Sequence, residues 1–394
     1  MKNILLALLI MIVFQQCSFK AKNVLMVPRL EERGVVKVYF DREGFVYPPE
    51  AHVTPHYFYL QHIRNEKRRQ SNPAFATLEY AMRENDSLNQ AYLRQRHGLQ
   101  GVDSVRFFIR LQNILRKNLA TQIQQQLQQA NSKHVVVLIH GFNDPNPDAY
   151  YFSLRRSIQQ FVKQPIVFVE VYWDGLTSLG SNPIVAGIWG KAQINSAKVG
   201  LGLRQLLQQI DPGVKLTLLT HSLGASVASH TLFNPQKWPK QFQEKLEEDY
   251  KSNAIATPRS SQICLAMLAP AISGTQVMDD ILRTVPEKNQ AGFRKIVIGY
   301  NKYDYAVSKG GLFAKSFGNT ALGANAGGEV EKTEKLIKQL DPSVQCRSID
   351  FSYMRSIDGL DKKQARQLRQ KEHSILFYQQ NAQFPQFLKA VFEN

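Results

Sequence analysis

The chain has 394 residues, of which 43% are hydrophobic, and this is enough for a sizeable core in one large domain or two. Its 49 Lys and Arg against 32 Asp and Glu give a formal charge of +17, and the composition excludes wholesale disorder. The sequence contains no Cys and His spacing typical of a zinc site and no glycine-rich phosphate loop, so it predicts neither a metal nor another cofactor.

The basic charge has two interpretations. It could attract anionic partners such as nucleic acid or the acidic polymers and lipids of a cell envelope. It could also be a generally basic surface that keeps the protein soluble. We favour the second because no nucleic-acid motif accompanies the charge, and no nucleic-acid partner is expected. The oligomeric state is not predictable from these features.

The first 17 residues have the pattern of an export signal. Lys2 precedes an apolar run, residues 4–14, that is too short to span a bilayer and suits a secretory signal. Cys17 follows where cleavage is expected and resembles the lipidated cysteine of bacterial lipoproteins, although Gln16 replaces the usual small residue before it. We expect an exported protein that Cys17 anchors to a membrane of the cell envelope; a plain signal peptide, giving a periplasmic or secreted protein, is the alternative.

Residues 18–130 are predicted to form an extension of short strands followed by helices. Two strand-like runs within 34–47 suggest a hairpin, and residues 56–130 have a mostly helical pattern. Apolar residues at helical spacing predict one buried face near the end of this region; they are Leu111, Ile114, Leu115, Leu119 and Ile123.

From residue 131 the pattern alternates between strands and helices, as in a mostly parallel α/β sheet flanked by helices. The expected strands are 134–139, 166–172, 215–220, 262–268, 294–300 and 344–351. The expected helices are 148–162, 191–210, 223–233, 330–340 and 361–390. Three insertions, 174–190, 271–293 and 310–328, are candidate lids or simple surface excursions.

The first of these strands ends in His140-Gly141-Phe142. A sharp turn at His-Gly would leave the backbone N–H of Phe142 free to point into a site. In acyl transfer, negative charge develops on the former carbonyl oxygen, and fixed N–H donors stabilise it. The N–H of Phe142 is therefore one candidate donor for such an oxyanion hole.

A second strand ends in Thr220-His221-Ser222-Leu223-Gly224, followed by small and apolar residues. This is the pattern of a strand, a sharp turn and a helix that expose a serine hydroxyl, with Thr220 in place of the usual first glycine of G-x-S-x-G. Ser222 would be the nucleophile, and the N–H of Leu223 the second oxyanion donor. An ordinary strand-to-helix loop is the alternative for the second motif taken alone.

Together, the H-G-F-N stretch and the T-H-S-L-G turn resemble the α/β-hydrolase superfamily, most closely its bacterial members of unassigned substrate. The resemblance implies an acid and then a histidine later in the chain. Asp304 follows the strand at 294–300 and matches the acid, with Asp350 as the second choice; His373 matches the base. His230 is expected to pack on the helix after the turn, and His221 to shape the site.

The sequence thus predicts an α/β-hydrolase fold in a domain at 131–394 and a catalytic triad of Ser222, Asp304 and His373. The expected activity is hydrolysis of an ester, with an amide as the alternative, through an acyl-serine intermediate, on a small-molecule or lipid substrate. A non-catalytic envelope protein that uses the same fold for binding or assembly is the competing hypothesis. Cys264 and Cys346 lie in strands that are not expected to be neighbours, which favours two buried free thiols over a disulfide.

Overall fold

A computed structural model describes residues 32–48, 87–142, 147–173, 175, 185–233, 260, 262–274, 293–304, 306–307, 322–340, 342–352 and 372–393. The expected export signal at 1–17, with Cys17, and most of the three candidate lids lie outside these residues. None of the described helices is long and apolar enough to cross a bilayer.

In the described residues, seven strands form one sheet in the order β1-β3-β2-β4-β5-β6-β7, and every neighbouring pair is parallel. The strands are β1 (Val35–Phe40), β2 (His134–Ile139), β3 (Val167–Trp173), β4 (Lys215–His221), β5 (Gln262–Leu268), β6 (Phe293–Tyr300) and β7 (Gln345–Asp350). The central strands are almost continuously buried because helices cover both faces, as parallel sheets require. The predicted parallel α/β architecture is confirmed.

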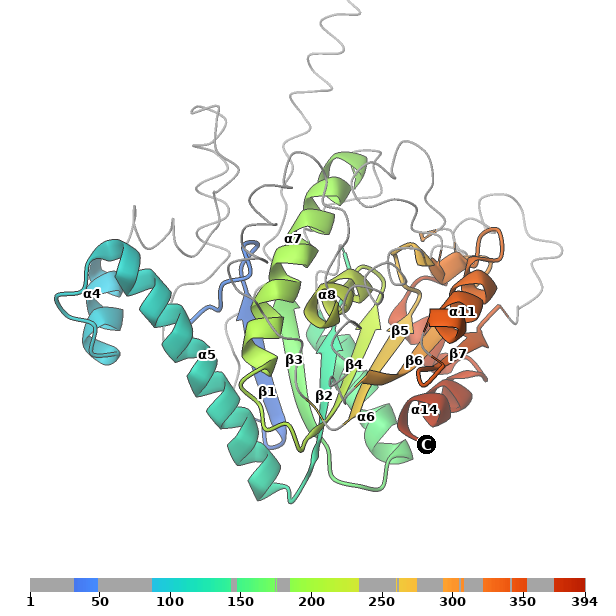
Figure 1. Cartoon of the computed structure of the whole chain (residues 1–394), viewed down its shortest axis with the longest axis horizontal. Coiled ribbons are helices and arrows are strands. Elements are labelled where there is room, and N and C mark those ends of the chain that lie inside the picture. The colour runs from blue at the N-terminus through green and yellow to red at the C-terminus, as the bar shows by residue number, and fades with distance from the viewer. Residues whose placement is uncertain are drawn as a thin grey trace, which may run out of the picture.

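The described helices cover the two faces of the sheet. They are α4 (Ser87–Arg96), α5 (Ser104–Gln129), α6 (Pro147–Phe161), α7 (Val185–Leu207), α8 (Gly224–Leu232), α11 (Glu329–Leu340), α13 (Ile375–Gln380) and α14 (Phe384–Phe392), with a short 3₁₀ turn, η2 (Leu322–Ala324). Helices α7 and α8 lie together in front of the sheet in Figure 1, and α6 lies behind it. Helix α6 contacts α13 and α14, so these three share a face.

Strand β1 comes from the segment expected to be an extension, yet it is an edge strand of the same sheet. It pairs in parallel with β3, from Val35 opposite Phe168 to Phe40 opposite Trp173. The expected hairpin is limited to one antiparallel bridge between Phe40 and Val46. Helix α5 packs its predicted apolar face against this edge, with Leu111 and Ile123 fully buried.

Two expected helices have different limits in the structure. Helix α7 begins at Val185, so the last six residues of the first candidate lid are helical. The sequence did not indicate this start because Gly187 and Gly190 are poor helix formers. The expected helix at 361–390 contains two helices in its described part, because Asn381 turns the backbone between them. Its side chain accepts the N–H of Gln383 and donates to the carbonyl of Phe351.

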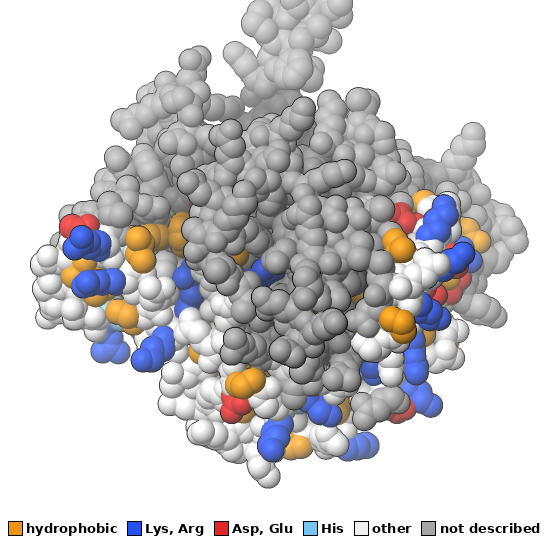
Figure 2. Space-filling model, viewed as in Figure 1, with side chains coloured by type: hydrophobic (Ala, Val, Ile, Leu, Met, Phe, Trp, Pro, Cys, Tyr) orange, Lys and Arg blue, Asp and Glu red, His pale blue; other side chains and the backbone are white. Residues whose placement is uncertain are grey.

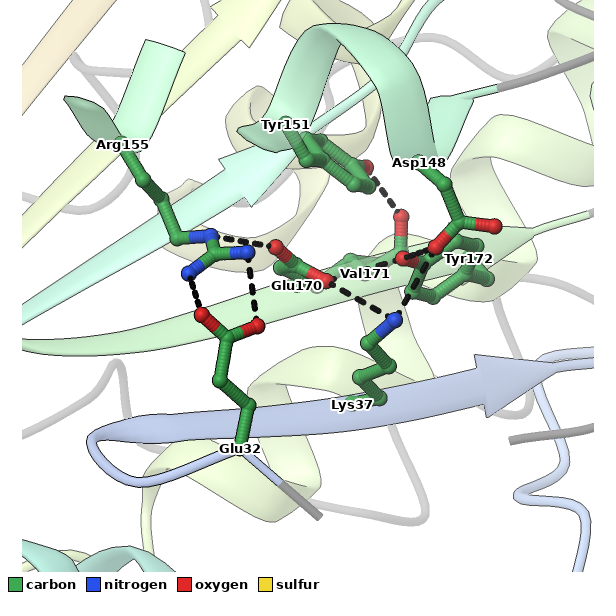
Figure 3. Close-up of polar contacts among 8 residues, drawn as sticks. All are labelled: Glu32, Lys37, Asp148, Tyr151, Arg155, Glu170, Val171 and Tyr172. Carbon is green, nitrogen blue, oxygen red and sulfur yellow. Dashed lines mark hydrogen bonds and ion pairs between the residues drawn. The ribbon is translucent and has the colours of Figure 1, made fainter. Parts of the chain in front are cut away.

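A buried glutamate lies in the middle of β3 (Figure 3). Glu170 is 1% exposed and forms ion pairs with Arg155 of α6, Nε to Oε1 2.8 Å, and with Lys37 of β1, Nζ to Oε2 3.7 Å. Burial raises the pKa of Glu170, and the two cations oppose that effect. The three residues tie α6 to the outer strands of the sheet.

Further partners complete this cluster on its outer sides. The Arg155 guanidinium donates to both carboxylate oxygens of Glu32, at 2.6 and 2.8 Å. The Tyr172 hydroxyl lies between Asp148 and Glu170, and Lys37 Nζ donates to Asp148 at 3.0 Å. The first turn of α6, which starts five residues after Phe142, is thereby fixed to the sheet.

The Lys and Arg side chains of the described residues are spread out on the face seen in Figure 2. They extend from the region of α4 and α5 to that of α11 and form no single patch there. Cys264 and Cys346 are both buried free thiols, as expected from strands β5 and β7, which β6 separates.

Candidate active site

Ser222 lies at the sharp turn between β4 and α8. Its φ of +53° is in the left-handed region, which a serine adopts only when its surroundings hold it there. Its N–H donates to the carbonyl of Leu268 at 3.0 Å, and its own carbonyl accepts the N–H of Ala225 and of Ala271, both at 3.1 Å. The strained turn is therefore fixed from both sides.

The His-Gly turn after β2 lies directly against this serine. Strands β2 and β4 are neighbours, with Ile139 opposite Thr220, so their carboxyl ends meet at one edge of the sheet. A Cβ placed on Gly141 would lie 2.7 Å from the Cβ of Ser222 and 3.3 Å from its Oγ. Gly224 allows a second close approach, since a Cβ there would lie 2.6 Å from the carbonyl oxygen of Ile139.

The three side chains expected to form the triad lie in one hydrogen-bonded chain. His373 Nε2 is 3.0 Å from Ser222 Oγ, and His373 Nδ1 is 2.8 Å from Asp304 Oδ2. Because a carboxylate only accepts, Nδ1 carries the proton and Nε2 is free to accept the serine proton. This is the arrangement that a serine needs to become a nucleophile.

Asp304 reaches this position from a tight turn after β6, where its N–H donates to the carbonyl of Asn301 at 2.9 Å. His373 precedes α13, which Ser374 caps by accepting the N–H of Phe377 at 3.2 Å. Asp350, the second choice for the acid, forms an ion pair with Lys302 at 3.1 Å instead.

Residues 116–308 match a family model described as "Alpha/beta hydrolase of unknown function (DUF900)". Over this segment the chain is similar to an α/β-hydrolase family, and the seven-stranded parallel sheet flanked by helices is consistent with that fold. The search of curated proteins finds no match. The matched segment contains Ser222 and Asp304, whereas His373 lies beyond its end.

The side chain of Asp304 is fully buried. Burial alone would raise the pKa of Asp304, but His373 and the N–H of Ala306 outweigh it, and the pKa is lowered below its ordinary value. Asp304 therefore remains ionised at neutral pH, as the partner of an imidazole must be.

His221, beside the serine, points away from it. Its Nε2 lies 2.7 Å from the backbone carbonyl of His373, so Nε2 carries a proton and donates it to that carbonyl. Burial, and then the neighbouring His373, lower the pKa of His221 to about 3. A neutral His221 thus holds the segment that carries His373. His230 packs within α8, with Nδ1 2.7 Å from the carbonyl of Ser226, as expected.

His140 and Tyr151, which sequence reasoning missed, fix the His-Gly turn. His140 Nδ1 donates to the carbonyl of Gly141 at 2.9 Å, and its Nε2 accepts the N–H of Trp173 at 3.2 Å. The Tyr151 hydroxyl accepts the N–H of His140 and donates to the carbonyl of Val171, the second of which is seen in Figure 3. Burial lowers the pKa of His140 to about 4, so the ring stays neutral and keeps both roles.

The two candidate oxyanion donors, the N–H groups of Phe142 and Leu223, directly follow Gly141 and Ser222 in the chain. Phe142 comes directly after the turn, and its ring packs edge-on against Trp189 of α7 at 5.0 Å. Leu223 is the residue before α8. Neither N–H donates to a backbone carbonyl among the described turns and loops.

No group of three or more His, Cys, Asp or Glu in the described part of the chain is arranged to hold a metal ion. The side chains of Ser222, His373 and Asp304 are instead hydrogen-bonded to one another. What the arrangement can do chemically is to remove a proton from the serine and stabilise the resulting imidazolium.

Proposed function

We propose that the protein is a serine hydrolase that cleaves an ester through an acyl-Ser222 intermediate. The observation that carries the proposal is the hydrogen-bonded chain from Asp304 through His373 to a serine held at a strained turn. A binding or assembly protein would have no need for the strain or for the proton acceptor. The similarity of residues 116–308 to an α/β-hydrolase family, and the fold, support the same conclusion.

The reaction would take place in two steps. His373 Nε2 takes the proton of Ser222 as its Oγ attacks the substrate carbonyl, and the N–H groups of Phe142 and Leu223 stabilise the oxyanion. The leaving group then takes the proton from Nε2. Water, activated by the same nitrogen, attacks the acyl-enzyme and regenerates the serine. Asp304 stays ionised and stabilises the imidazolium.

An ester is the leading substrate class, and an amide would use the same groups. The machinery is the same for both because each needs a nucleophile, an oxyanion hole and a proton for the leaving group. A screen of p-nitrophenyl esters and anilides on the purified protein separates these two classes.

Labelling with a fluorophosphonate probe tests the proposal. The wild type should react, and Ser222→Ala and His373→Ala should lose the reaction, by about 10⁴-fold or more in rate. Ser157→Ala, which alters a half-buried serine on α6, is the matched control and should react as the wild type does. Folding of each variant is checked by its thermal transition. A folded wild type that does not react would favour the non-catalytic binding protein.

We also propose that the hydrolase is exported and anchored in the cell envelope through lipid on Cys17. The motif at residues 4–17 supports this. Expression of the full chain with Cys17→Ala, followed by separation of membrane and soluble fractions, tests it. Release of the variant from the membrane fraction is expected, and equal retention of both proteins would contradict the anchor.

A further inference from the structure

Tyr378 contacts the proposed acid, Asp304, inside the protein. It lies on α13, is completely buried, and its hydroxyl is 3.2 Å from Asp304 Oδ2. Its ring packs against Phe351, with ring centroids 4.9 Å apart at 63°. No signal in the sequence singles it out, because the contact depends on how α13 packs against the end of β6.

The direction of this hydrogen bond follows from the charges. An ionised carboxylate has only acceptor atoms, so the phenol must donate. Burial, and then the nearby Asp304, raise the pKa of Tyr378 well above its ordinary value, which keeps the hydroxyl protonated. A hydrogen bond to a charged acceptor is stronger than one between neutral groups.

Asp304 therefore receives three donors in fixed directions. Oδ2 accepts from His373 Nδ1 and from Tyr378, and Oδ1 accepts the N–H of Ala306 at 2.9 Å. Rotation of the carboxylate would break both hydrogen bonds at Oδ2, whereas without the Tyr378 hydroxyl it would break only the one to His373. The plane of the carboxylate, and with it the direction in which it meets the imidazole, is thereby determined.

One helix connects the two contacts. His373 lies two residues before α13, and Tyr378 lies within it, so the segment that carries the base also carries the donor that orients the acid. Asn381, at the end of α13, donates to the carbonyl of Phe351, the residue against which Tyr378 packs. Any shift of α13 would move both partners of Asp304 together.

We propose that Tyr378 is a positioning residue for the hydrolytic reaction, whose hydroxyl holds the Asp304 carboxylate in the orientation that meets His373 Nδ1. This inference rests on the proposed serine hydrolase function. It assigns to Tyr378 no contact with substrate.

Tyr378→Phe removes the hydroxyl and keeps the ring. We expect kcat for p-nitrophenyl acetate and the rate of fluorophosphonate labelling to fall about 10-fold, the effect of losing one charge-assisted hydrogen bond. KM should stay within about twofold because substrate binding is not altered. The matched control is Tyr300→Phe, which removes a hydroxyl that donates to Asp350 over the same 3.2 Å, and it should leave kcat unchanged.

A double-mutant cycle distinguishes positioning from a merely structural role. In the Asp304→Asn background, Tyr378→Phe should cause little further loss of kcat, because the group it orients is gone. Equal losses in both backgrounds would mean that Tyr378 acts independently of the acid, and this would overturn the inference.

A spectroscopic measurement gives a readout besides activity. The downfield ¹H resonance of the proton shared by His373 Nδ1 and Asp304 should shift or broaden in Tyr378→Phe, and not in Tyr300→Phe. An unchanged resonance together with unchanged kcat overturns the inference while the proposed function stands. A wild type that reacts with neither the ester nor the probe overturns both.

Discussion

Gly141 and Ser222 approach so closely that a single added methyl group on the glycine would lie 2.7 Å from the serine Cβ. Real Cβ contacts are almost never this short, so Gly141→Ala must move either the His-Gly turn or the serine. Both carry groups that the proposed reaction needs. We expect kcat to fall by about 10² or more, the size of effect seen when an oxyanion donor is lost.

The measurement for Gly141→Ala is the rate of hydrolysis of p-nitrophenyl acetate, with the thermal transition recorded in parallel. Gly213→Ala is the control, since its added Cβ meets only the Asp211 side chain at 3.2 Å in an exposed turn. An alanine at 141 with wild-type kcat would show that the turn has no role in the reaction.

His221 offers a test of how the base is held. His221→Phe keeps an aromatic ring but removes the N–H that donates to the carbonyl of His373. We expect labelling of Ser222 to slow about 10-fold, because His373 gains freedom to leave its 3.0 Å contact. His221→Gln retains a donor and should lose less. Equal rates for the two variants would contradict this role.

The buried ion pairs of Glu170 predict a large effect on stability. Arg155→Met would leave the Glu170 carboxylate in the sheet with the more distant Lys37 as its one charged partner among the described residues. Removing one partner of a buried pair costs about 3–5 kcal/mol of the free energy of unfolding. Urea denaturation of Arg155→Met should show a loss of this size.

The double variant Arg155→Met, Glu170→Gln is the control for that measurement. It also removes the charge that the arginine compensates, so it should be more stable than the single variant. If the double variant is the less stable of the two, the ion pair is not the cause of the loss.

Three buried histidines predict how stability depends on pH. The pKa values of His140, His221 and His230 are lowered to about 4, 3 and 4, in each case first by burial. In the unfolded chain these rings titrate near their ordinary value of 6.5. Between about pH 6.5 and pH 4 the unfolded state therefore binds more protons, and the free energy of unfolding falls as the pH is lowered.

Each such histidine contributes a slope of up to about 1.4 kcal/mol per pH unit in this interval. Urea denaturation at pH 7, 6 and 5 should show the decrease in the free energy of unfolding. In His230→Gln the dependence of this free energy on pH should be smaller by the contribution of one histidine. A free energy of unfolding that is constant from pH 7 to pH 5 would contradict the assignment.

Much of the fold follows from local patterns. The limits of strands β2 to β7 agree with the prediction within a few residues. For β2, β4 and β5 the reason is that apolar runs between turns suit strands buried on both faces. The three side chains expected for the triad also meet in the structure. Ser222 and Asp304 could be predicted because each follows a parallel strand, and the carboxyl ends of parallel strands lie at the same edge of the sheet. His373 could be predicted because His230 is the only other histidine after Ser222 in the sequence.

The supporting residues could not be predicted, because their roles depend on contacts between distant segments. In the sequence, Tyr378 and Tyr151 cannot be distinguished from other buried aromatic residues. Their contacts form only when α13 and α6 pack in the folded protein. Glu170 reads as a break in an apolar strand, and its partners lie on other elements. The place of β1 depends on its pairing with β3, more than a hundred residues away.

The backbone at Ser222 has a consequence for the history of this chain. A φ of +53° is one that glycine adopts freely and serine does not. Mutation to glycine at this position would remove the strain and the hydroxyl together. If Ser222 is the nucleophile we propose, the product would be more stable and inactive. A lineage that no longer used the hydroxyl would thus drift toward glycine at no cost in folding. A serine at position 222 is therefore expected if selection for its hydroxyl has continued.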